Sequence, residues 1–249
     1  MWEQLLFIVI AGFISAMVDA IAGGGGLISL PALLLAGVPP HLALGTNKFA
    51  STTSSFTSSL TFFRSGKVSV AVVKRQIIFT FIGAALGVLT VLRVDPGVLN
   101  RLIPILILVV ALYTALRKDL GLDNRYTTLK RSSLVIGCCF AFVIGFYDGF
   151  FGPGTGSFLI IAFIATFGFD FLIASANAKV LNFTSNLASL LMFALNGKIA
   201  LLYGIPMACF MILGARVGSK LAIKNGAKLV RPVFIAMSLL MAVKMIVMP

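Results

Sequence analysis

An internal repeat is the strongest constraint on how this chain can fold. Residues 19–48 contain an aspartate, a glycine run, a short apolar segment and a lysine, and residues 148–179 repeat that order. The spacing between the copies changes by only two residues from the aspartates to the lysines. It then stays constant at the next landmark, which is Gly66-Lys67 in the first copy and Gly197-Lys198 in the second. A long-period repeat of this kind predicts two homologous structural units.

Composition predicts that both units lie in a membrane. The chain is 59% hydrophobic and only 11% charged, whereas a soluble domain carries roughly 25% charged residues. Apolar runs over 77–92, 102–116 and 133–147 approach the ~20 residues that a helix needs to cross ~30 Å of hydrocarbon. We therefore expect an all-α polytopic membrane protein.

Each half is expected to contain about four long helices and one short element. The expected long helices cover 5–21, 42–63, 70–92 and 99–116 in the first half, and 134–151, 171–195, 201–222 and 229–247 in the second. The short apolar elements, over 27–36 and 157–167, each follow a glycine-rich break. The first is about ten residues, or ~15 Å of helix, so it is either a broken crossing or a re-entrant segment. The expected boundaries are 1–117 for the N-terminal repeat, 118–131 for a linker and 132–249 for the C-terminal repeat.

Basic residues predict how the halves are oriented. They cluster over 64–75, in the linker and over 216–231, and such clusters mark cytoplasmic loops. The net charge of +13 is explained in the same way and does not require nucleic acid as a partner. Gly66-Lys67 is then cytoplasmic while its repeat mate Gly197-Lys198 is external. We therefore expect inverted-topology repeats, with both termini on the external side.

The glycine breaks are the first candidate for a binding site. Inverted repeats with short, glycine-interrupted segments at matching positions indicate a transport site near the bilayer midplane. A helix that begins after a glycine run presents free N–H groups and the positive end of its dipole to an anion. The alternative is that these glycines only allow close helix packing. The candidate residues are Gly23, Gly24, Gly25, Gly26, Gly152, Gly154 and Gly156.

The helix after each short element adds polar residues along one face. In the second half the spacings alternate between four and three along a single helical stripe, which consists of Ser175, Lys179, Asn182, Asn186 and Ser189. A lysine inside a membrane helix indicates function by default, and the alternative is a lysine that reaches the headgroups. The candidate residues are Asn47, Lys48 and Ser51 in the first half, and Asn177, Lys179, Asn182 and Asn186 in the second.

Two aspartates, Asp19 and Asp148, each end an apolar run. They could pair with Lys48 and Lys179, or they could take up protons during transport. The cysteines Cys138, Cys139 and Cys209 have no metal-ligand spacing, and we expect neither a cofactor nor a metal.

At these residues the sequence resembles the TauE/SafE family of sulfite and organosulfonate exporters, and within it the YfcA-like branch. The shared segments include Asp-Ala-Ile-Ala-Gly-Gly-Gly-Gly from residue 19, Gly-Thr-Asn-Lys from 45, and Gly-Phe-Tyr-Asp-Gly-Phe-Phe-Gly-Pro-Gly-Thr-Gly from 145. The resemblance runs along nearly the whole chain. It implies a permease of the bacterial inner membrane for small sulfur-containing or carboxylate anions.

The resulting hypothesis is a secondary transporter, not an enzyme, that exports a small anion by alternating access. The glycine run over 23–26 lacks the Gly-Lys-Ser/Thr sequence that ends a P-loop. Its absence there argues against a nucleotide-driven pump. An anion leaving a negative-inside cell gains ~2.3 kcal/mol per charge per 100 mV. An anion-selective channel and cation-coupled anion uptake are the alternatives, and an intramembrane aspartic hydrolase using Asp19 and Asp148 is a remote one. The expected partners are a small anionic substrate and the lipid bilayer, with a homodimer left open.

Overall fold

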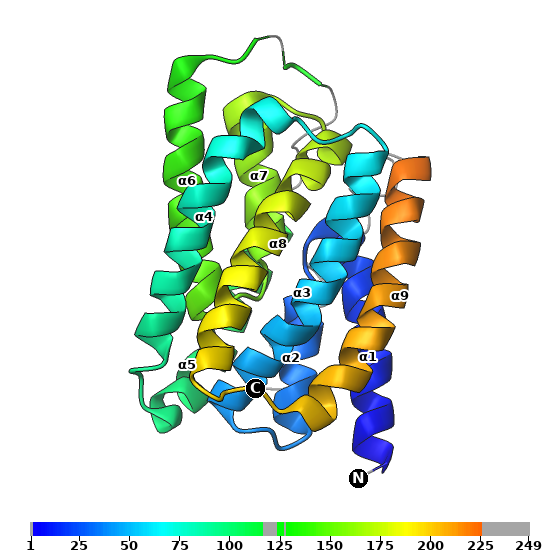
Figure 1. Cartoon of the computed structure of the whole chain (residues 1–249), viewed down its shortest axis with the longest axis vertical. Helices are drawn as coiled ribbons and strands as arrows, with labels where there is room; N and C mark the ends of the chain where they lie inside the picture. The colour runs from blue at the N-terminus through cyan, green and yellow to red at the C-terminus, as the bar shows by residue number, and fades with distance from the viewer. Residues whose placement is uncertain (1, 117–123, 127, 226–249) are drawn as a thin grey trace.

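The computed structural model describes residues 2–116, 124–126 and 128–225, which form nine α-helices and no strand (Figure 1). The expected helix over 229–247 lies outside the described residues. The others appear close to their expected bounds: α1 (Trp2–Ala22), α2 (Gly26–Leu35), α3 (Pro40–Arg64), α4 (Val70–Val91), α5 (Pro96–Leu116), α6 (Arg131–Phe150), α7 (Thr155–Phe167), α8 (Phe171–Leu195) and α9 (Leu201–Asn225).

Five of these helices, α1, α4, α6, α8 and α9, are long and apolar enough to cross a bilayer. Their outward faces carry exposed large apolar side chains, for example Ile10, Leu86 and Val143. Helix α3 has the same length as α8 but is rich in serine and threonine, and it lies against both α8 and α9. The expectation of an all-α polytopic membrane protein is confirmed.

The short helices re-enter rather than span. Helix α2 has ten residues, about 15 Å of helix, and its connection to α3 lies at the same end of the molecule as the N-terminus (Figure 1). Helix α7 likewise returns toward the end at which α6 begins (Figure 1). The reversals use glycines at positive φ, Gly23 at 80° before α2 and Gly152 at 98° before α7. Other residues rarely adopt this conformation.

Corresponding helices of the two halves run in opposite directions. In Figure 1 the chain rises along α3 and descends along α8, and it descends along α4 and rises along α9. One contact is repeated in both halves. The Thr46 hydroxyl oxygen accepts a bond from the Ala200 N–H at 2.9 Å, and the Asn177 side-chain oxygen accepts one from the Ser69 N–H, also at 2.9 Å. Each bond joins the start of a central helix to the residue just before α9 or α4 of the other half.

The packing of the helices crosses the boundary between the repeats. Helix α4 of the first half packs chiefly on α6 and α8, and α9 of the second half packs on α1 and α3. The α4–α6 contact is close because glycines face backbone: a Cβ at Gly83 or Gly87 would collide with main-chain atoms of α6. Small residues permit such approach in membranes. Two bundles result, α1–α2–α3–α9 and α6–α7–α8–α4.

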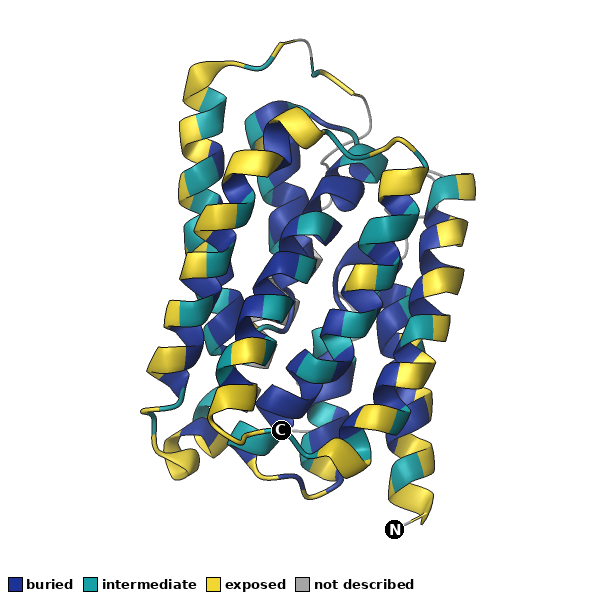
Figure 2. Ribbon diagram, viewed as in Figure 1, coloured by how far each residue is buried: buried dark blue, intermediate teal, exposed yellow. Residues whose placement is uncertain are grey.

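Apolar residues form two separate clusters, one around each short helix. Leu30 and Leu33 of α2 belong to the first, with residues from the ends of α3, α4, α8 and α9 that lie on that side. Phe163 and Phe167 of α7 belong to the second, at the other end of the molecule. Figure 2 shows this buried interior along the inner faces of the helices. The polar groups described below therefore have an apolar layer on either side.

Candidate functional site

The glycine breaks of the two halves lie against each other. A Cβ on Gly156 would come within 2.5 Å of the Gly23 Cα, so neither position has room for a side chain. The Ser157 N–H donates to the Gly23 carbonyl at 3.1 Å, and the Ser157 hydroxyl donates to the Ala22 carbonyl at 3.1 Å. The N-terminal ends of α2 and α7 therefore meet inside the molecule. Both helix dipoles present their positive ends to the same region.

Two ion pairs join the repeats crosswise. The Lys48 ammonium of α3 lies 2.7 Å from the Asp148 carboxylate of α6, and the Lys179 ammonium of α8 lies 2.6 Å from the Asp19 carboxylate of α1. Both lysine side chains are at most 2% exposed. Each lysine therefore has its countercharge from the other half of the chain. This is the ion-pair arrangement that the sequence left open beside proton uptake.

Each aspartate is also tied to the glycine break that follows it. Asp19 accepts a bond from the Gly25 N–H at 3.3 Å, and Asp148 accepts one from the Thr155 hydroxyl at 2.8 Å. The Ser15 hydroxyl donates to the Gly25 carbonyl at 2.8 Å. The position of each short helix is thus coupled directly to the charge on a carboxylate.

Asn186 of α8 links the central helices. Its side-chain oxygen accepts a bond from Lys48 at 3.1 Å, while its amide nitrogen lies 3.4 Å from the Ser55 oxygen and 3.2 Å from the Asn182 oxygen. Residues 182 and 186 lie on the predicted stripe and face α3 in the structure. The stripe therefore forms the contact between the two bundles.

These groups surround a polar cavity of about 20 Å³, which is space for about one water molecule. Two oxygens of its lining residues, Asn47 Oδ1 and Asp148 Oδ2, are buried and have no hydrogen-bond partner within the described part of the chain. The lining residues are Ser15, Asp19, Gly23, Gly25, Gly26, Asn47, Lys48, Ser51, Ser54, Asp148, Gly152, Gly154, Thr155, Gly156, Asn182, Asn186 and Met211. A conformation with a wider cavity is needed to admit a larger anion.

Three of the predicted residues are placed elsewhere. A Cβ added at Gly24 would have no atom within 4 Å, and Gly24 does not line the cavity. Lys179 contacts the site only through its ion pair with Asp19. Asn177 binds the backbone of residues 69 and 173. Its repeat mate is Thr46, which makes the equivalent bond.

The lining also includes Ser15, Ser54, Thr155 and Met211, which the sequence did not single out. Thr155 could have been found, because it sits inside the second glycine break. Ser54 lies among many similar residues of α3, and Met211 reaches the site from α9, so neither carries a local signal.

Comparison with known proteins identifies membrane transporters as relatives of this chain. Residues 8–245 match the family described as sulfite exporter TauE/SafE. The chain is 42% identical over 244 residues to a "Probable membrane transporter protein" of Haemophilus influenzae, covering 98% of this chain and 95% of that one. It is 42% identical over 239 residues to the "Probable membrane transporter protein YfcA" of Escherichia coli K12, covering 95% and 86% respectively. No solved structure matches. The chain belongs to the TauE/SafE family.

Proposed function

We propose that this protein is a secondary transporter that exports a small sulfur-containing or carboxylate anion by alternating access. The observation that carries the proposal is the crosswise pair of Lys–Asp bridges, Lys48 with Asp148 and Lys179 with Asp19, beside the meeting point of two helix N-termini. Lys48 lines the polar cavity, Lys179 contacts it through Asp19, and two positive dipole ends point toward the same region. The family is described as one of sulfite exporters, which supports the sulfur-containing class of cargo.

The charges suggest how an anion would be recognised. In the structure each of the two lysines is neutralised by an aspartate. A substrate anion can therefore pair with a lysine ammonium only after it has displaced the aspartate carboxylate from that ammonium. Because Asp19 and Asp148 also bind the ends of α2 and α7, displacement would release those helix ends. Substrate binding and helix movement are therefore coupled through the same carboxylates. A displaced carboxylate would also be free to take up a proton.

The two apolar clusters are proposed as gates on either side of the site. The moving bodies that the packing favours are α1–α2–α3–α9 and α6–α7–α8–α4, rather than residues 1–117 and 132–249. The loops before α4 and α9 would act as hinges, and each contains a glycine at positive φ, Gly66 at 70° and Gly197 at 62°.

The orientation follows from the distribution of basic residues. The end of α3, the start of α4 and the start of α6 lie at one end of the molecule (Figure 1), and carry Arg64, Lys67, Lys74, Arg75 and Arg131. We place this end in the cytoplasm of a bacterial cell by the positive-inside rule. The N-terminus is then external, as is the loop that contains Lys198.

The geometry weighs against a hydrolase. Two catalytic aspartates that share a proton must face each other, whereas Asp19 and Asp148 are each bonded to a lysine. A continuously open anion channel is also disfavoured, because apolar clusters lie on both sides of a cavity with space for about one water.

A flux assay on purified protein in liposomes tests the proposal. Sulfite, thiosulfate, sulfoacetate and small carboxylates would each be supplied with the membrane potential clamped at either sign. A carrier gives saturable flux of at least one of these anions. It also gives counterflow, in which labelled anion exchanges against unlabelled anion. Flux that rises linearly with concentration and shows no counterflow indicates a channel and contradicts alternating access. Inward anion flux that requires an inwardly directed cation gradient indicates cation-coupled uptake.

A further inference from the structure

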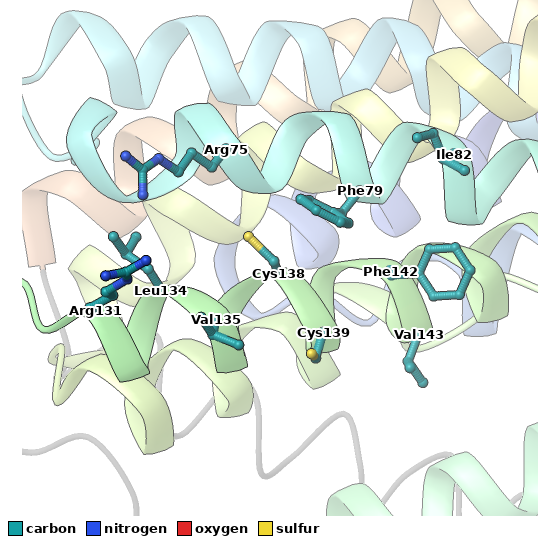
Figure 3. Close-up of a pocket in the computed structure, with 10 residues that line it drawn as sticks. All are labelled: Arg75, Phe79, Ile82, Arg131, Leu134, Val135, Cys138, Cys139, Phe142 and Val143. Atoms are coloured by element: carbon teal, nitrogen blue, oxygen red, sulfur yellow. The ribbon is translucent and has the colours of Figure 1, made fainter.

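A second and much larger cavity lies on the outer side of the bundle, between α4 and α6 (Figure 3). Its volume is about 740 Å³, within the roughly 300–1,000 Å³ of small-molecule pockets. The two helices are in backbone contact through Gly83 and Gly87 farther along α4, and the cavity lies beside their N-terminal halves. It is separate from the polar site, which has no lining residue in common with it.

The lining of this cavity is amphipathic along its length. Arg75 of α4 and Arg131 of α6 lie together at one end, and Phe79, Val135, Phe142 and Val143 extend away from them (Figure 3). The apolar residues face the exterior: Val135 is 59% and Val143 63% exposed. In a membrane protein, an exposed apolar surface of this kind contacts the acyl chains of lipids.

The two arginines form an unpaired cationic site. Neither guanidinium has an ion pair or a side-chain hydrogen bond to any residue that the structure describes. Two guanidinium groups held at one end of a cavity without an acid repel each other, so an anion between them is stabilised. A phosphate group matches the planar fork of donors that each arginine offers.

The repeat provides an internal comparison. The same positions in the other half are Pro206, early in α9, and Trp2, at the start of α1. Neither carries a charge. The cationic feature is therefore present only at the basic end of the molecule, whereas close packing by glycines is shared by both helix pairs, α4–α6 and α1–α9. Fold symmetry alone does not explain the two arginines.

We propose that this groove is a binding site for an anionic phospholipid of the leaflet at the basic end. The phosphate lies between Arg75 and Arg131, and an acyl chain runs along Phe79 and Val143 toward the bilayer interior. Basic pockets between membrane helices on the cytoplasmic side bind such headgroups. The inference does not depend on the transported anion.

Native cysteines can report on the occupant. Cys139 lies in the groove and is exposed, and Cys209 of α9 is exposed elsewhere and serves as the control in the same molecule. Purified protein in nanodiscs would be treated with a maleimide, and modification of each cysteine followed by mass spectrometry. Phosphatidylglycerol should slow modification of Cys139 relative to phosphatidylcholine and leave Cys209 unchanged. Soluble glycerol phosphate should protect neither cysteine.

Separate substitutions test the contact with the lipid headgroup and the contact with the acyl chain. Each arginine near an anionic lipid is worth about fivefold in binding, so Arg75→Gln and Arg131→Gln should each reduce the phosphatidylglycerol preference about that much. Arg64→Gln, an exposed arginine at the same end, should leave it unchanged. Val135→Trp should fill the groove and abolish the preference with both arginines intact.

Three outcomes overturn the proposal. The first is equal protection of Cys139 by both lipids. The second is protection by glycerol phosphate as strong as that by phosphatidylglycerol, which indicates a free-anion site. The third is a dimer cross-linked through Cys139, which indicates that a second copy of the chain covers the groove.

Discussion

Lys48 and Asp148 belong to opposite halves of the chain, yet their side chains lie 2.7 Å apart in the protein interior. The inverted counterpart of this contact joins Lys179 to Asp19 at 2.6 Å. The repeat therefore does more than duplicate a set of residues, because each half supplies the countercharge that the other half lacks. Neither half can bury its lysine with its own aspartate in this arrangement.

Removing one partner of this bridge should destabilise the protein. Asp148→Ala leaves the buried Lys48 ammonium without its countercharge, which costs about 3–5 kcal/mol. The double variant Lys48→Met/Asp148→Leu removes both charges, so it should recover most of that loss while remaining inactive in flux. Denaturation in detergent micelles measures the stability of both variants. An Asp148→Ala protein as stable as the wild type would show that the pair is not formed.

Lys179→Gln should abolish or strongly reduce anion flux while the protein still inserts into the membrane. The side chain loses the charge that an incoming anion needs but keeps a polar end for Asp19 to bind. Lys220→Gln is the matched control, because Lys220 of α9 is exposed and should not affect flux. Both variants would be compared in liposomes after quantifying inserted protein. Equal flux in Lys179→Gln and wild type would remove this lysine from the mechanism.

Adjacent glycines of the first break should respond differently to alanine. Gly23 has φ +80° and contacts the backbone of Gly156, so Gly23→Ala meets both strain, about 1–2 kcal/mol, and a collision that separates the short helices. Gly24→Ala meets no atom within 4 Å and should be close to neutral. Thermal stability and flux measured side by side check this. Similar behaviour of the two variants would contradict the contact between the breaks.

Two asparagines on one helix should separate binding from structure. Asn186→Ala removes the group that holds Lys48 against α8, so we expect weaker anion binding, seen as a higher KM. Asn177→Ala removes a bond to the Ser69 N–H, which should cost about 1 kcal/mol of stability with KM unchanged. Saturation kinetics and denaturation on the same preparations distinguish these results. A raised KM in Asn177→Ala would place that residue in the site after all.

Lys67 and Lys198 are exposed residues of repeat-related loops at opposite ends of the molecule (Figure 1). Single cysteines at these positions, introduced after replacing Cys138, Cys139 and Cys209 by serine, should react with an impermeant maleimide from opposite sides of the membrane. Position 67 should react in inside-out vesicles and position 198 in right-side-out ones. Labelling of both from one side would contradict the inverted arrangement.

The local character of the sequence was enough to predict much of the fold. Apolar length predicted the long helices, and α8 has the expected bounds of 171 and 195. The glycine runs predicted the breaks, because positive φ is a local property. Most of the predicted glycines and polar residues line the cavity for the same reason: they lie at breaks or on one helical face, and both features can be read from spacing.

Other features depend on long-range packing, and only the tertiary structure decided them. Sequence length could not determine whether α2 re-enters, because a ten-residue helix fits both arrangements until its ends are placed. The pairing of Lys48 with Asp148, rather than Asp19, depends on how two bundles interlock. The exchange of α4 and α9 between the halves depends on glycine faces that meet only after folding. The sequence by itself determined which residues are charged, apolar or free to turn, and the packing decided which of them meet.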